Sequence, residues 1–128
     1  LDIRPACRAE CSPRMTGYRE LCQGCVTPEA AEHLLPDRAL LGMLWRYLSA
    51  AGGEVRENPM CLCRKVVRWS GMPMSLGQLM TCLDIFHDVG LIEVRRLTNQ
   101  ITIRLLETQV KRDLNESLTM QRLLAAKE

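Results

Sequence analysis

Four cysteines near the start of the chain have the type and spacing of metal ligands. Cys7 and Cys11 are separated by three residues, and Cys22 and Cys25 by two. Four thiolates in tetrahedral reach can hold a structural zinc ion. Zinc ribbons, however, normally have two CxxC pairs, and only the second pair has that form. Because cysteine also serves as a small apolar residue, the pattern favours free thiols, and we predict no stoichiometric zinc.

The other cysteines and the histidines do not form a reactive group in the sequence. Cys61 and Cys63 lie two positions apart on a predicted helix, about 200° around its axis, so they cannot share one ion. Cys82 falls among leucines and is expected to pack in the core. His33 and His87 have no nucleophile as a sequence neighbour. Glycine-rich phosphate loops and Asp/His clusters that hold two metal ions are also absent from the sequence, so we expect no catalysis and no cofactor in this chain.

Basic side chains form two groups that could contact a phosphate backbone. The first group lies on a helix expected over residues 59–69, and the second on a hairpin expected over residues 91–105. The six candidates are Arg64, Lys65, Arg68, Arg95, Arg96 and Arg104. The helix expected between the groups has no Lys or Arg and carries two aspartates. Arginine contacts to guanine, the commonest specific contact, are therefore unavailable there, and the sequence predicts weak binding without sequence preference.

Residues typical of helix ends predict three helices, and the second of them carries the first basic group. Asp37 is a cap residue for the first helix, and Gly52-Gly53 ends it. Asn58-Pro59 starts the second helix, with Leu62, Val66 and Trp69 as its apolar stripe. The third helix begins at Ser75, where Gln78 completes a capping box, and it ends at Gly90. Gln78 and Thr81 are expected on the exposed side of this third helix.

A hairpin and a last helix complete the order of elements. Two segments that alternate apolar and polar residues flank the polar turn Thr98-Asn99-Gln100, which is the pattern of a β-hairpin. The last helix is expected from about Asn115. Three helices followed by a hairpin are typical of a winged helix, a helix-turn-helix variant. The sequence thus predicts an α+β, mostly helical, winged-helix-like domain over residues 37–128, preceded by a connector over residues 1–36, which also holds a short helix after Pro28.

Composition is consistent with one ordinary globular domain. The chain has 128 residues, of which 47% are hydrophobic and 25% charged, with a formal net charge of +2. That charge alone is too small to indicate a nucleic-acid-binding protein. The sequence contains no apolar run long enough for a membrane span and no signal-peptide pattern. With an odd number of cysteines, seven, these features predict a cytoplasmic protein with reduced thiols.

Several short motifs resemble the C-terminal region of the RecJ family, the bacterial single-stranded-DNA-specific exonucleases. They run across nearly the whole chain, from the end of an OB-fold domain through the C-terminal domain, and residues 6–34 carry least of the likeness. The motifs are Leu1-Asp2-Ile3-Arg4-Pro5, Leu35-Pro36-Asp37-Arg38, Leu44-Trp45-Arg46-Tyr47-Leu48, residues 83–92 and Lys111-Arg112-Asp113-Leu114-Asn115-Glu116-Ser117. The sequence departs from the family pattern at Arg112, where an apolar residue is more usual.

The resemblance implies a role as part of a larger enzyme. RecJ-like enzymes degrade single-stranded DNA from the 5′ end in recombination and repair, with a metal-dependent (Mn²⁺ or Mg²⁺) catalytic core that this sequence lacks. The chain would be the non-catalytic accessory module. Its implied partners are the catalytic domains of the parent protein, single-stranded DNA and single-stranded-DNA-binding protein.

Two other functions remain open from the sequence. A winged-helix transcriptional regulator or replication factor would use the third helix to read duplex DNA, which its acidic character disfavours. A zinc-stabilised interaction domain would need the four early cysteines. Under the accessory-module hypothesis, charge reversal at Arg95 and Arg96 lowers DNA affinity for all sequences alike, and substitution of Gln78 or Thr81 has little effect.

Overall fold

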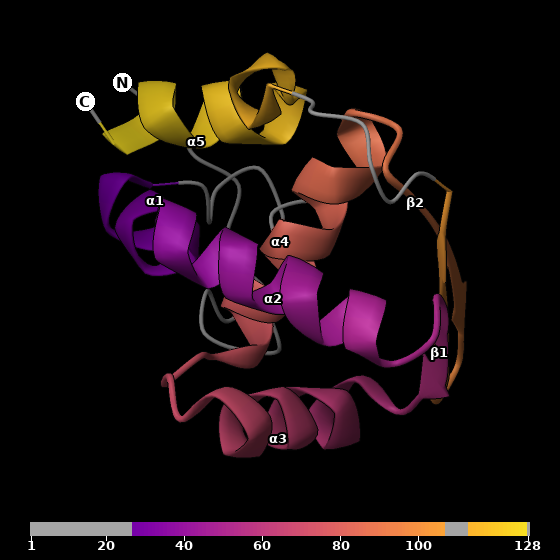
Figure 1. Ribbon diagram of the computed structural model, residues 1–128. Coiled ribbons are helices and arrows are strands. Elements are labelled where there is room, and N and C mark those ends of the chain that lie inside the picture. The colour runs from indigo at the N-terminus through magenta and orange to yellow at the C-terminus, as the bar shows by residue number, and fades with distance from the viewer. Residues whose placement is uncertain (1–26, 107–112, 128) are drawn as a thin grey trace.

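The computed structural model describes residues 27–106 and 113–127 of the chain. Its helices enclose a single main core, and a small sheet lies at one side of them (Figure 1). The helical elements are α1 (Pro28–Leu34), α2 (Arg38–Ala50), α3 (Pro59–Ser70), α4 (Leu76–Asp88), a 3-10 turn η3 (Leu114–Glu116) and α5 (Leu118–Lys127). The predicted positions of the three central helices are confirmed.

The sheet has three antiparallel strands in the order β1-β3-β2. Their bounds are β1 (Glu54–Glu57), β2 (Ile92–Leu97) and β3 (Gln100–Leu105). The predicted hairpin is confirmed as β2 and β3, whereas β1 was not predicted from the sequence. With β1 between α2 and α3, the chain is an α+β, mostly helical protein with the predicted winged-helix-like order.

Strand β1 forms because of its pairing rather than its own sequence. Its four residues are mostly charged, and only Val55 is buried. Val55 pairs with Ile103 of β3, whose side chain is also buried. Gly52 and Gly53 precede the strand with φ angles of 90° and 89°, which side chains larger than glycine rarely adopt. The two glycines therefore turn the chain from α2 into the sheet.

Side chains at the helix ends match the predicted caps. Asp37 accepts a hydrogen bond from the backbone N–H of Leu40 at 2.7 Å. Ser75 and Gln78 form the predicted capping box of α4. The last helix begins at Leu118, later than the predicted Asn115, because residues 114–116 form η3 instead. There Asp88 of α4 accepts hydrogen bonds from the Ser117 hydroxyl and the Thr119 N–H, at 2.7 and 3.0 Å.

Asn58 both caps α3 and ties it to the hairpin turn. Its side-chain oxygen accepts from the N–H groups of Met60 and Cys61, and its amide donates to the Asn99 carbonyl at 3.2 Å. We expect Asn58→Ala to lower the free energy of unfolding by about 1–2 kcal/mol, the usual cost of losing an N-cap. Urea denaturation measures this, with Asn115→Ala, an exposed residue of η3, as the control. Equal stability of the two variants would contradict the capping role.

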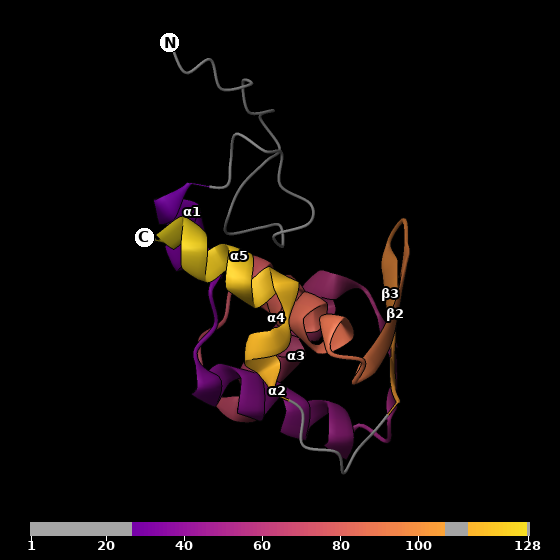
Figure 2. The ribbon, with the colours of Figure 1, turned by 90° about the horizontal axis from the view of Figure 1, so that it is seen from above.

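Helix α4 occupies the centre of the helical layer, between α2, α5 and the sheet in both views (Figures 1 and 2). Nine of its residues are buried, namely Gly77 and the run from Leu79 to Phe86. The prediction that Thr81 is exposed is wrong, since its side chain is fully buried and its hydroxyl donates to the Gly77 carbonyl at 2.8 Å. Apolar spacing predicted one buried stripe, but neighbours cover this helix on nearly every side.

Helices α1 and α5 pack together beside α4. Ala31 and Leu34 of α1 meet Leu123 of α5 in a small second cluster of fully buried side chains. Leu35, which follows α1, contacts both this cluster and the main core. The end of the predicted connector over residues 1–36 thus packs onto the helical domain, and the rest of it lies outside the described residues.

Hydrophobic length also bears on the relation to membranes. Within residues 27–106 and 113–127, no helix combines the length and apolar character that a membrane crossing requires.

Candidate nucleic-acid interface

Three of the six predicted contact residues lie together on the solvent side of α3. Arg64, Lys65 and Arg68 are all exposed, at spacings of three and four residues that place them on one helix face. Lys65 forms an ion pair with Glu57 of β1, and this hydrogen bond raises the pKa of the lysine. For Arg64 and Arg68, the described part of the chain places no carboxylate within ion-pair distance. Of the three predicted contacts on α3, these two guanidinium groups are the better placed to meet a phosphate.

The outer face of the sheet carries arginines that glutamates neutralise. Arg95 lies 3.4 Å from Glu93, and Arg56, which is not among the six predicted contacts, lies 3.5 Å from Glu54. Arg104 stands on β3 opposite both glutamates in the strand register. Because both signs of charge lie on this face, its net attraction for a polyanion is small. The second predicted group should therefore contribute less to DNA binding than its number of arginines indicates.

Arg96, the other predicted contact on β2, does not share this face. Successive residues of a strand point to opposite faces, so Arg96 faces the helices while Arg95 faces solvent. Its guanidinium bonds the Asp84 carboxylate of α4 at 2.8 Å, where Asp84 is only 5% exposed. Arg96 therefore links the hairpin to α4, and the Asp84 carboxylate offsets the charge of its partly exposed side chain.

The position of α4 determines what the fold can read on DNA. In helix-turn-helix proteins a recognition helix lies in the major groove with its side chains on base edges. Here α4 is the corresponding third helix of the winged-helix order, and it is enclosed by its neighbours. Gln78 is half-buried and His87 is exposed near its end. Base-edge readout by α4 therefore has few side chains to use.

An aromatic pair, of which Trp69 is exposed and Tyr47 half-buried, adjoins the basic residues of α3. Trp69, which the sequence assigns to the apolar stripe of this helix, is 53% exposed. Its ring packs edge-to-face against Tyr47 of α2, with centroids 5.5 Å apart and an angle of 76°. Burial is the largest cause that raises the pKa of Tyr47, and the Glu57 carboxylate raises it further. The positive charge of Lys65 lowers it in part. The spacing of Trp69 matches the apolar stripe, but spacing does not show how far along the helix the core extends. Trp69 lies near the C-terminal end of α3, where about half of its surface stays accessible.

The cysteines of the described region differ sharply in access. Cys61 is exposed, whereas Cys63 and Cys82 are buried; Cys63 donates to the Met74 carbonyl at 3.4 Å. Burial is the largest cause that raises the pKa of the Cys82 thiol well above its ordinary value, and the nearby carboxylates of Asp37 and Asp84 raise it further. Cys7, Cys11, Cys22 and Cys25, the predicted alternative zinc ligands, lie outside the described residues. Within residues 27–106 and 113–127, no group of three or more His, Cys, Asp or Glu side chains could hold a metal ion.

This difference predicts the order of thiol alkylation. Because thiolate is the reactive form, iodoacetamide at pH 8 is expected to modify Cys61 at least about tenfold faster than Cys82. Site-resolved mass spectrometry of the folded chain measures both rates, and the same reaction in denaturant is the control, where the rates should converge. Equal rates in the folded chain would contradict the burial of Cys82.

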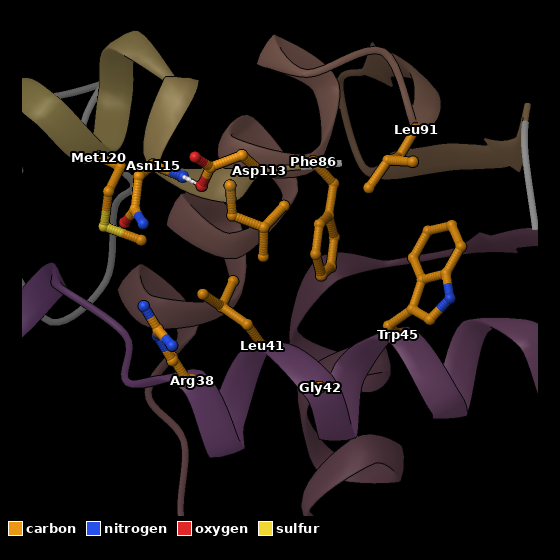
Figure 3. Close-up of a pocket in the computed structure, with 10 residues that line it drawn as sticks. Arg38, Leu41, Gly42, Trp45, Phe86, Leu91, Asp113, Asn115 and Met120 are labelled. Carbon is orange, nitrogen blue, oxygen red and sulfur yellow. Dashed lines mark hydrogen bonds between the residues drawn. The ribbon is translucent and has the colours of Figure 1, made fainter. Parts of the chain in front are cut away.

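A pocket lies between α2, α4 and the segment that leads into α5 (Figure 3). It has a volume of about 530 Å³. Figure 3 shows Leu41, Trp45 and Phe86 pointing into it, with Arg38 at the far end from Trp45. Trp45 and Phe86 meet edge-to-face at 5.5 Å. The described residues that line it are mostly apolar, with Arg38, Asp113 and Asn115 as the polar ones.

The described surface thus offers cations and an aromatic pair on α2 and α3, a charge-balanced sheet face and an apolar pocket. Such groups can bind a ligand by charge and by contact with a flat ring. Comparison of the chain with protein-family models, with curated proteins and with solved structures found no match to it.

Proposed function

We propose that this chain is a non-catalytic accessory module that contacts DNA weakly and without sequence preference through α3. One observation carries the proposal. The third helix of the winged-helix order is buried, whereas Arg64 and Arg68, which form no ion pair with any described residue, lie on the exposed side of α3. Contacts to the phosphate backbone carry no sequence information. A surface of this kind supports retention on DNA rather than selection of a site.

The parent protein that best fits the motif resemblance is a cytoplasmic single-stranded-DNA-specific 5′–3′ exonuclease of recombination and repair. Hydrolysis, with its Mn²⁺ or Mg²⁺, would belong to the catalytic domains of that parent. In the described part of this chain no side-chain cluster fits such an ion, and no step of the reaction is assigned to it. The module would dock on those domains and on a protein partner such as single-stranded-DNA-binding protein.

A winged-helix regulator or replication factor is the second candidate. The strand order β1-β3-β2 and the placement of β1 between α2 and α3 favour it. This function requires sequence-specific duplex binding, for which a bidentate contact typically contributes about 1–3 kcal/mol of discrimination per base. Strong preference for one duplex would therefore separate it from the accessory module.

Charge reversal on α3 tests the proposal. We expect Arg68→Glu to weaken binding to every DNA tested and to reduce the slope of log affinity against log salt by about one. The slope for the unaltered chain should be about −2 to −4, as only a few phosphates are contacted. Fluorescence anisotropy with labelled oligonucleotides over a salt series measures both quantities.

Arg122→Glu provides the matched control. Arg122 is exposed on α5, which lies on the opposite side of the molecule from α3 (Figure 1), and its reversal changes the net charge by the same amount. Little change is expected in this control. If the two variants lose affinity equally, overall charge rather than α3 governs binding; if the unaltered chain binds no DNA, the proposed function is wrong.

A further inference from the structure

The exposed aromatic pair beside the cations of α3 is the feature that the proposed function leaves unused. About half of the Trp69 surface is accessible, although a tryptophan normally buries most of its large apolar area. Tyr47 packs against the Trp69 ring from α2. The ring is therefore braced by a neighbouring helix while it remains open to a ligand.

The charges around this ring are positive on balance. Lys65 lies one helical turn before Trp69, next to Glu57 and within electrostatic reach of Tyr47. The Glu57–Lys65 pair cancels its own charge. Arg68 and Arg64 lie about 100° and about 140° around the helix from Trp69, on the adjoining exposed side of α3. Within residues 27–106 and 113–127, no carboxylate lies within ion-pair distance of either arginine. An open aromatic ring with cations beside it suits a ligand that has both a flat face and a phosphate.

We propose that this surface, formed by Tyr47, Arg64, Arg68 and Trp69 and here named the aromatic–basic face, is a stacking site for single-stranded nucleic acid. The inference rests on the proposed function and adds strand selectivity to it. Bases of a duplex stack on one another and hide their faces, whereas bases of a single strand can turn out and stack on an aromatic side chain. The arginines would hold the adjoining phosphates and the indole would hold the base.

Charge complementarity favours this ligand over an apolar protein segment. A groove for an amphipathic helix needs a row of apolar anchors at helical spacing. Between Met60 and Trp69, three of the four exposed positions of α3 hold cations, and the fourth is Cys61. Stacking tolerates any base because each base has a π face, which agrees with binding that lacks sequence preference.

The test compares affinities for a single strand and for a duplex of equal length. With the full chain and labelled oligothymidine, Trp69→Leu is expected to lower single-strand affinity roughly five- to hundredfold, the range known for lost base stacking. Duplex affinity should stay within about twofold, since phosphate contacts persist. Trp69→Phe, which keeps an aromatic ring, should restore most of the loss.

Tryptophan fluorescence gives an independent measurement. The chain has two tryptophans, and Trp45 is half-buried against Phe86. In Trp45→Phe, the emission of Trp69 alone should be quenched by oligothymidine and not by duplex.

The outcomes separate this inference from the proposed function. Loss of single-strand preference in Trp69→Leu, with rescue by Trp69→Phe, would support the stacking site. Equal binding of single strand and duplex, unchanged by Trp69→Leu, would overturn the stacking site and leave the phosphate-contact proposal standing. Failure to bind either nucleic acid would overturn both.

Discussion

Replacement of Leu83 by alanine is expected to lower the free energy of unfolding by about 3–4 kcal/mol. Leu83 lies on α4, the helix that its neighbours enclose, and its side chain is fully buried. The variant loses the transfer free energy of the removed groups and also leaves a cavity that a packed core closes only in part. Because a domain of this size has a total stability of about 5–15 kcal/mol, the effect should appear plainly in urea denaturation.

Leu118→Ala is the matched control, since the same groups are removed from a side chain that is 59% exposed. Its stability should change by no more than about 0.5 kcal/mol. If the two leucine variants unfold at the same urea concentration, α4 does not occupy the centre of the core. Burial would then no longer limit the use of α4 as a recognition helix.

Removal of the Arg96 guanidinium is expected to destabilise the protein by about 2–3 kcal/mol. Breaking one side of a buried ion pair costs about 3–5 kcal/mol, and we expect less here because the Arg96 side chain is 33% exposed. Arg96→Met keeps the aliphatic stem against the core but deprives the nearly buried Asp84 carboxylate of its 2.8 Å partner. Chemical denaturation of this variant measures the cost.

Arg95→Met is the control on the same strand. Arg95 forms an ion pair with Glu93, but its side chain is 78% exposed, and exposed pairs contribute about 0–1 kcal/mol. Adding Asp84→Asn to Arg96→Met should recover part of the lost stability, because it removes the charge left without Arg96. Equal stability of Arg95→Met and Arg96→Met would contradict a structural role for Arg96.

Local signals in the sequence were sufficient for most of the fold. Asp37, Asn58 and Ser75 each accept backbone hydrogen bonds at the start of a helix, as their residue types indicate. Alternation around Thr98-Asn99 located the hairpin. Strand β1 was missed because its stability comes from pairing with β3, more than 40 residues later, and its four residues show no apolar alternation. Pairing between distant segments is not encoded in either segment alone.

The candidate site was predicted only in part, for a similar reason. Residue type identified Arg64, Lys65 and Arg68, and the structure keeps them together on one exposed face. Sequence proximity placed Arg95 and Arg96 in one group, although strand geometry sends them to opposite faces and Asp84 binds the second. The exposure of Trp69 was missed because helical spacing gives the direction of a side chain but not how far the underlying core extends.

Chemical-shift mapping of the full chain tests the central claim, that α3 and not α4 meets the nucleic acid. Amide spectra of isotope-labelled protein would be recorded as unlabelled oligothymidine is added at low salt. We predict that the largest shift changes cluster on residues 64–69 of α3 and around Tyr47, and disappear as salt is raised. Changes centred on α4 near Gln78 and His87, with α3 unaffected, would contradict the account.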